Sequence, residues 1–158
     1  YTEYTCGVEK AKETISSTRG VLEVKKAVLA KYAKQSAMFG FPDLVEGSQK
    51  TCELVEGELD IIYALWDHID ETNIMLDGFL ATKWEDVNCD KMEDSVKMAK
   101  KALTARIKGQ IRKYNAYGDF TKHLKKWTVF TELIMELTHE SMTVDDDRHW
   151  EEVRAIVS

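Results

Sequence analysis

The sequence predicts an all-α protein: an elongated bundle of about five helices, one of them long and coiled-coil-like. The 158 residues include one proline and eight glycines, and 32% of them are charged, a composition typical of long helices rather than of sheets. Apolar residues recur at three- and four-residue spacing through most of the chain, with no competing strand pattern. No apolar run approaches the roughly 20 residues that cross a membrane.

The first helix is expected from about Val8 to Ser36, because apolar residues recur there every seven positions. Gly20 weakens this helix, so a break is possible at that point. The Phe-Gly-Phe-Pro segment at 39–42 ends it, since proline disfavours helical geometry in the residue before it. The seam consists of Val8, Ala11, Ile15, Thr18, Leu22, Leu29 and Tyr32, with Lys25 as the exception.

A second helix is expected from Leu44 to Ala81, with Asp43 as its cap and Glu46 completing a capping-box pair. At 1.5 Å per residue it would be roughly 57 Å long, which suggests a rod-like bundle. Its one polar seam residue, Asn73, either fixes the register of the helix or lies where the seam meets solvent. The seam has strict 4-3 spacing and comprises Val55, Leu59, Ile62, Trp66, Ile69, Asn73, Leu76 and Leu80.

Three shorter helices are expected after a connector at 84–89. The third begins at an acidic cap, Asp90 with Glu93, and ends near Tyr114. Residues 115–118 form a turn, Asp119 caps the fourth helix, and the acidic loop at 145–147 suits the start of a fifth. The apolar faces are Met92, Val96, Ala99, Leu103, Ile107 and Ile111 in the third helix, Phe120, Leu124, Trp127, Phe130, Ile134 and Leu137 in the fourth, and Trp150, Val153 and Val157 in the fifth.

The sequence contains no catalytic or metal-binding pattern that can be defended. Cys6, Cys52 and Cys89 are odd in number and form no CxxC pair, which favours free thiols and argues against a zinc site. The four histidines lack the spacing of paired ligands, and the Lys-Thr step at 50–51 lacks the glycines of a phosphate-binding loop. We therefore expect no catalytic residue, cofactor or metal in these 158 residues.

Two other features bear on function. The four tryptophans lie at positions typical of core aromatics, which would lock the helices into one unit. A block from Lys100 to Lys126 holds nine Lys or Arg and one acidic residue. It is either a solvated helix face or a surface for nucleic acid, acidic lipid or an acidic protein.

A series of motifs from Met38 to Trp150 resembles the N-terminal linker region of dynein heavy chains. It comprises a Phe-Gly break at 38–42, a Leu-Trp step at 65–66, a Thr-Lys-Trp connector at 82–88, a charged helix at 92–113, a helix with an apolar end at 127–137, and an Arg-His-Trp triplet. The connector is more similar to axonemal heavy chains, particularly outer-arm ones, than to cytoplasmic dynein. The segment 137–147 departs from the family, since it lacks a proline and ends in acids. The motif residues are Trp66, Trp84, Trp127, Arg148, His149 and Trp150.

The resemblance implies a tail-side helix at 1–40 and a linker bundle at 41–158, both part of a much larger polypeptide. Such a segment would transmit force between an AAA+ ring and the tail during microtubule-based movement in cilia or flagella. It would not be an enzyme itself, because ATP and Mg would bind in downstream modules. Its location would be cytoplasmic or cytoskeletal, in the axoneme.

The implied partners are the tail and ring of the same chain and other dynein heavy, intermediate or light chains. Microtubules would be bound only through the distant motor region, and we expect no nucleic acid or membrane partner. The alternative function is a spectrin-like scaffold module for protein–protein interaction, which the heptad seam and the lack of a catalytic set would suit. Scaffold repeats should show self-similarity at a fixed period, and the two halves of the chain show none.

Overall fold

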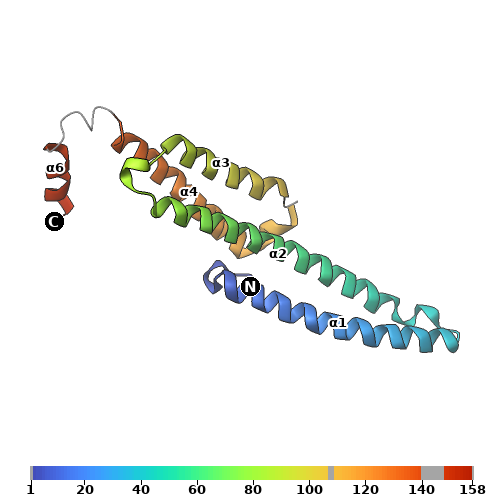
Figure 1. Ribbon diagram of the computed structural model, residues 1–158. Helices are drawn as coiled ribbons and strands as arrows, with labels where there is room; N and C mark the ends of the chain where they lie inside the picture. The colour runs from blue at the N-terminus through green and yellow to red at the C-terminus, as the bar shows by residue number, and fades with distance from the viewer. Residues whose placement is uncertain (1, 107–108, 140–147, 158) are drawn as a thin grey trace.

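The computed structural model describes residues 2–106, 109–139 and 148–157, and these residues form helices and turns without a strand (Figure 1). The prediction of an elongated all-α bundle is confirmed. The α-helices are α1 (Val8–Met38), α2 (Glu46–Leu80), α3 (Cys89–Arg106), α4 (Asn115–Leu137) and α6 (Arg148–Val157). The 3-10 helices are η1 (Tyr4–Cys6), η2 (Pro42–Val45), η3 (Trp84–Asp86) and η4 (Gly109–Lys113).

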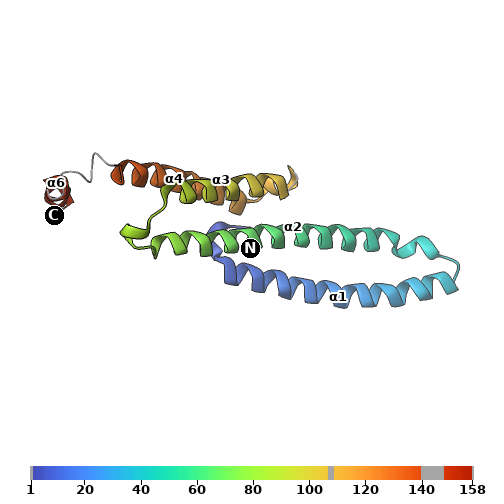
Figure 2. The same ribbon diagram turned by 45° about the horizontal axis from the view of Figure 1, so that its top comes forward.

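The helices form two antiparallel pairs that meet along α2 (Figures 1 and 2). One pair is a long hairpin of α1 and α2, whose tip points away from the rest of the molecule. The other pair, α3 and α4, lies on the opposite side of α2 from α1 and covers only its C-terminal half. The first helix thus packs back along α2, a point that the sequence pattern left open. η1 turns inward and contacts α4.

α1 runs through Gly20 without a break, and a glycine ends it. Gly40 has a φ of 79°, which is a left-handed conformation that glycine adopts without steric cost. Its N–H donates to the carbonyl of Ala37 at 3.1 Å, and the N–H of Phe41 donates to the carbonyl of Ser36 at 2.8 Å. This pair of bonds is a Schellman motif, which satisfies carbonyls that a helix end leaves without partners.

The predicted cap of the second helix is wrong. Pro42 begins η2, where its fixed φ and missing N–H suit the first helical position, and Asp43 therefore lies inside that 3-10 turn. α2 begins at Glu46, and Val45 precedes it without a side-chain cap hydrogen bond. The helix is 35 residues long and extends to Leu80, close to the predicted end.

The predicted caps of the third and fourth helices are also wrong. The Asn88 side-chain oxygen accepts the backbone N–H of Lys91 at 2.9 Å, so Asn88 rather than Asp90 caps α3. α3 ends at Arg106 and η4 follows, instead of a helix continuing to residue 114. Residues 115–118 lie inside α4, so Asp119 is helical and pairs with Lys122 at 2.8 Å.

The core lies along α2, which is buried on two sides. The interior of its predicted seam is confirmed, whereas the seam ends Val55 and Leu80 are 37% and 64% exposed. α2 also buries Leu65, His68 and Thr72, which the seam pattern did not include. They are buried because α3 and α4 cover a second face of the helix. The confirmed seam residues are Leu59, Ile62, Trp66, Ile69 and Leu76.

The other helices each bury one face toward α2 or toward each other. Tyr32 in α1 and Phe130 in α4 are 56% and 38% exposed, against prediction. Thr131 is fully buried instead of Phe130. Ile107 lies outside the described residues. The buried predicted residues are Ala11, Ile15, Leu22, Met92, Val96, Ala99, Leu103, Ile111, Phe120, Leu124 and Ile134.

Candidate mechanical junction

The most informative site is a packed cluster of rings where η1, α2 and α4 meet. We name it the aromatic junction and define it as Tyr4, Trp66, His68, Phe120 and His123. Trp66 and Phe120 are fully buried, and His68 is 5% exposed. The described residues include no group of three His, Cys, Asp or Glu side chains able to hold a metal ion. Nor do they include a helix long and apolar enough to cross a membrane.

Tyr4 is the central ring of the aromatic junction. Its centroid lies 6.4 Å from that of Trp66, nearly parallel at 8°, 6.0 Å from Phe120 and 6.1 Å from His123. His68 meets Phe120 edge to face at 6.2 Å. These separations lie in the range where aromatic pairs attract each other beyond simple area burial. One residue of the N-terminal turn thereby joins α2 to α4.

Polar groups also surround the N-terminal turn. Burial is the main cause of the raised pKa of Tyr4, and the Asn73 side chain beside it has a smaller, opposing effect. Asn73 is half-buried, so it lies at the edge of the seam beside the N-terminal turn, and its role in fixing the helix register stays a prediction. The backbone N–H of Ala116 at the start of α4 donates to the carbonyl of Thr2 at 2.9 Å.

Two histidines extend the junction. The Nε2 atom of His68 lies 3.0 Å from the carbonyl oxygen of Ala99, which ties α2 to α3. The Nε1–H of Trp127 donates to Nε2 of His123 at 3.2 Å. Burial, helped by the charge of Lys126, lowers the pKa of His123 below its usual 6.5. The neutral ring that this favours is the form whose Nε2 can accept the bond from Trp127.

A second set of contacts, which we call the charge ladder, joins α1 to α2. Lys12, Arg19 and Lys26 are seven residues apart and each pairs with a carboxylate of α2. The hydrogen bond that Lys12 donates to Asp70 is the main cause of the raised pKa of Lys12. The pairs are Lys12 with Asp70 at 2.6 Å and with Asp67 at 3.1 Å, Arg19 with Asp60, and Lys26 with Glu56 at 2.6 Å.

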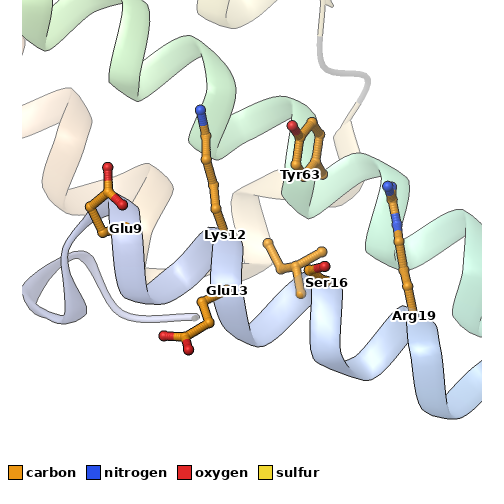
Figure 3. Close-up of a pocket in the computed structure, with 7 residues that line it drawn as sticks. Glu9, Lys12, Glu13, Ser16, Arg19 and Tyr63 are labelled. Atoms are coloured by element: carbon orange, nitrogen blue, oxygen red, sulfur yellow. The ribbon is translucent and has the colours of Figure 1, made fainter.

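Figure 3 shows Lys12 and Arg19 reaching from α1 toward α2, with Tyr63 between them. The guanidinium of Arg19 lies 5.0 Å from the centre of the Tyr63 ring. These three residues line a pocket between α1 and α2, and Glu9, Glu13, Ile15 and Ser16 complete its lining. Both of its cations are thus already engaged by α2. The charge ladder was not predicted from the sequence, although its signal is present there as cations that repeat every seven residues beside an apolar seam.

The predicted motif residues lie in different surroundings in the structure. Trp66 is in the aromatic junction, and Trp127 reaches it through His123 while meeting Phe130 edge to face at 5.2 Å. Trp84 is 46% exposed, because it lies in the short η3 connector and not on a helix face toward the core. The backbone of 148–150 begins α6, but the side chains of Arg148, His149 and Trp150 lie outside the described residues, as does the loop at 145–147.

The basic block is partly paired in the structure. Lys113 of η4 bonds Glu58 of α2 at 2.6 Å, and Lys122 pairs within α4. Its other described cations, Lys100, Lys101, Arg112, Lys125 and Lys126, are exposed. The block is therefore spread over α3, η4 and α4 and in part serves to hold η4 against α2.

A long helix that is held on two sides by rings and ion pairs defines a structural segment, a braced helical bundle. The sequence profile of the family described as "Dynein heavy chain, N-terminal region 2" matches residues 52–158. The chain therefore belongs to the dynein heavy chain family, and it comes from the N-terminal tail or linker region of that family.

The relatives found are axonemal. The chain is 22% identical over 153 residues to "Dynein alpha chain, flagellar outer arm" of Chlamydomonas reinhardtii, covering 97% of this chain and 3% of the relative. It is 21% identical over 146 residues to "Dynein axonemal heavy chain 17" of Homo sapiens, covering 92% of this chain and 3% of the relative. The chain thus spans about 3% of the length of these relatives. Their names support a location in the ciliary or flagellar axoneme.

Proposed function

We propose that this segment transmits force between the tail and the motor ring of an axonemal dynein heavy chain. The observation that carries the proposal is that α2 is one continuous helix, which pairs with α1 and also packs against the second pair. Its 35 residues span about 52 Å at 1.5 Å per residue. α1 covers one side of it, and α3 with η4 covers another. A displacement applied to either pair therefore has one unbroken path to the other.

Three features of the structure oppose deformation of that path. A helix kinks where its hydrogen-bond ladder is interrupted, and α2 continues from Glu46 to Leu80 as a single helix. The charge ladder and the apolar seam would resist sliding of α1 along α2, because sliding separates several pairs at once. The aromatic junction would resist separation of α4 from α2, since Tyr4 is packed against both.

The chemistry of movement belongs, in this proposal, to other parts of the heavy chain. Downstream AAA+ modules would hydrolyse ATP with Mg, and the distant motor region would bind microtubules. The segment itself would contact the tail and ring of its own chain and other heavy, intermediate or light chains. We propose neither nucleic acid nor membrane as a partner. Family membership supports these assignments.

Interrupting α2 in the parent heavy chain tests the proposal. Ala64 is exposed and lies in the part of α2 that is contacted by α1 on one side and by α3 and η4 on another. Ala64→Pro removes a helix hydrogen bond and costs about 3 kcal/mol or more, so we expect slower microtubule gliding with ATP hydrolysis retained. Lys83→Pro is the matched control, because Lys83 already has a φ of −67°, close to the angle that proline requires.

The outcomes are separable. Slower gliding for Ala64→Pro, with Lys83→Pro like the natural chain, supports force transmission through α2. If the proline variant loses its helical circular dichroism, Ala64→Gly replaces it, which softens the helix by only about 1 kcal/mol. Unchanged gliding by a folded Ala64 variant would refute the proposal.

A further inference from the structure

The side of α1 that faces away from the rest of the molecule carries a stripe of exposed apolar residues. We name it the outer α1 face and define it as Val21, Val24, Val28 and Tyr32, which are 55%, 66%, 43% and 56% exposed. Their spacing of three, four and four residues places them along one line of a helix. Figures 1 and 2 both show α1 at the edge of the molecule, with α2 on one side of it only.

This stripe is separate from the seam that packs on α2. Ile15 and Leu22 are buried in that seam, and Val21 precedes Leu22 by one residue, which is a turn of about 100° around the helix. α1 therefore has two apolar lines, one covered and one not. Contiguous exposed apolar residues on a folded protein commonly mark a contact surface.

The charge beside the stripe is of one sign. The segment 24–38 of α1 has four lysines and no acidic residue. Lys26 pairs with Glu56 on the α2 side. Lys25, Lys31 and Lys34 are exposed, and they form no ion pair with the residues that the structure describes. From the helical period, Lys25 lies just beyond Tyr32 on one flank of the stripe, and Lys31 lies just beyond Val24 on the other.

We propose that the outer α1 face binds an amphipathic helix of a partner polypeptide that carries Asp or Glu on both sides of its apolar seam. Valines of modest size let a second helix approach closely, and knobs-into-holes packing needs this 3-4 spacing. The two flanking lysines then face the positions at which helix pairs select partners by charge. This inference goes beyond force transmission and does not rest on it.

Charge argues against a second copy of the chain as the occupant. An antiparallel pair of α1 helices would bring the same flank of each copy together, so Lys25 would face Lys25 and Lys31 would face Lys31. A parallel pair would bring opposite flanks together, so Lys25 of one copy would face Lys31 of the other. Like charges at such positions repel, whereas acidic flanks attract.

The composition of the stripe argues against a lipid surface. Helices that lie in a membrane interface bury Trp, Phe and Leu side chains into the acyl boundary. The outer α1 face offers three valines and one tyrosine, a shallow surface suited to another helix. We therefore commit to an acidic helix as the occupant.

Fluorescence anisotropy with the purified full chain tests the inference. The probe is a designed, labelled four-heptad peptide with Ile and Leu in its seam and Glu at both flanking positions. The comparison peptide has Lys at the same flanks. We expect the Glu peptide to bind at least ~10-fold more tightly than the Lys peptide. Salt added above 0.15 M should weaken its binding, because the Debye length, about 8 Å at 0.15 M, then becomes shorter.

Site variants assign the binding to this face. Val24→Ser combined with Val28→Ser should weaken binding of the Glu peptide at least ~10-fold, as loss of a central apolar contact does. Lys25→Gln combined with Lys31→Gln should remove the preference for Glu over Lys flanks. Ile74→Ser is the matched control, because Ile74 is 68% exposed on α2, and it should leave binding unchanged. All these positions are exposed, so circular dichroism should show unaltered helices.

Several results would overturn the inference. One is equal binding of the two peptides, and another is binding that the valine variant leaves intact. Dimers in sedimentation that the valine variant abolishes would identify a second copy as the occupant. Binding of phosphatidylserine vesicles but of neither peptide would identify a lipid surface instead.

Discussion

Replacing Trp66 with alanine removes the largest fully buried side chain of the core. The indole has no exposed area, and its ring stacks on Tyr4 at 6.4 Å. A tryptophan buries up to about 250 Å², which at about 25 cal/mol per Å² corresponds to roughly 6 kcal/mol of transfer free energy at most. Measured truncations of buried aromatics cost about 3–5 kcal/mol. We therefore expect about 4 kcal/mol.

That loss should be visible in thermal unfolding followed by circular dichroism. In a chain of this length each kcal/mol shifts the midpoint by about 2–4 °C, so the Tm of Trp66→Ala should fall by roughly 10 °C. Trp84→Ala is the control: Trp84 is 46% exposed in a connector, and its loss should cost less than about 1 kcal/mol. Equal midpoints for the two variants would refute the assignment of Trp66 as the anchor of the junction.

Three further predictions concern His123, the charge ladder and the glycine that ends α1. The pKa of His123 is lowered in the folded chain, so the unfolded state binds the proton first as pH falls through 6.5, and the free energy of unfolding should drop below that pH. In His123→Phe, the urea concentration at the unfolding midpoint should therefore depend less on pH. A double-mutant cycle of Lys12→Met with Asp70→Asn should give a coupling below about 1 kcal/mol that fades in high salt, since the pair is partly exposed; a salt-independent coupling would contradict this. Gly40→Ala should destabilise by about 1–2 kcal/mol because of its positive φ, whereas an unchanged midpoint would mean that the turn relaxes.

Much of the fold was predictable because apolar periodicity survives in local sequence. The interior of the α2 seam, from Leu59 to Leu76, was predicted and is buried. The break at 39–42 was also predicted, since the preferences of Gly40 and Pro42 are local. Both are cases in which a residue's own geometry or spacing decides the structure.

The helix starts were predicted poorly because several residues compete to cap each one. At α3, Asn88 and Asp90 are both good caps, and the chain uses the first. At α4, Gly118 suggests a turn and Asp119 a cap, but the helix begins at Asn115 and the N–H of Ala116 donates to the carbonyl of the distant Thr2. Such choices depend on contacts with distant segments.

The aromatic junction could not have been assembled from the sequence. Tyr4 lies before the first predicted helix, and nothing local connects it with Trp66 or Phe120. Asn73 is the polar exception in the seam, and nothing in the local sequence indicates that it lies beside that same tyrosine. The charge ladder, in contrast, had a sequence signal in the seven-residue spacing of its cations.

The sequence by itself determined the helical class, the long α2 with its seam, the break at the hairpin tip and the resemblance to dynein heavy chains. These follow from properties within one or two helical turns or from motifs in fixed order. Only the tertiary structure decided that α1 folds back along α2, that α2 is covered on two sides, and which apolar residues stay exposed. The reason is that a helix's sequence specifies which faces are apolar, whereas burial depends on which other helix reaches each face.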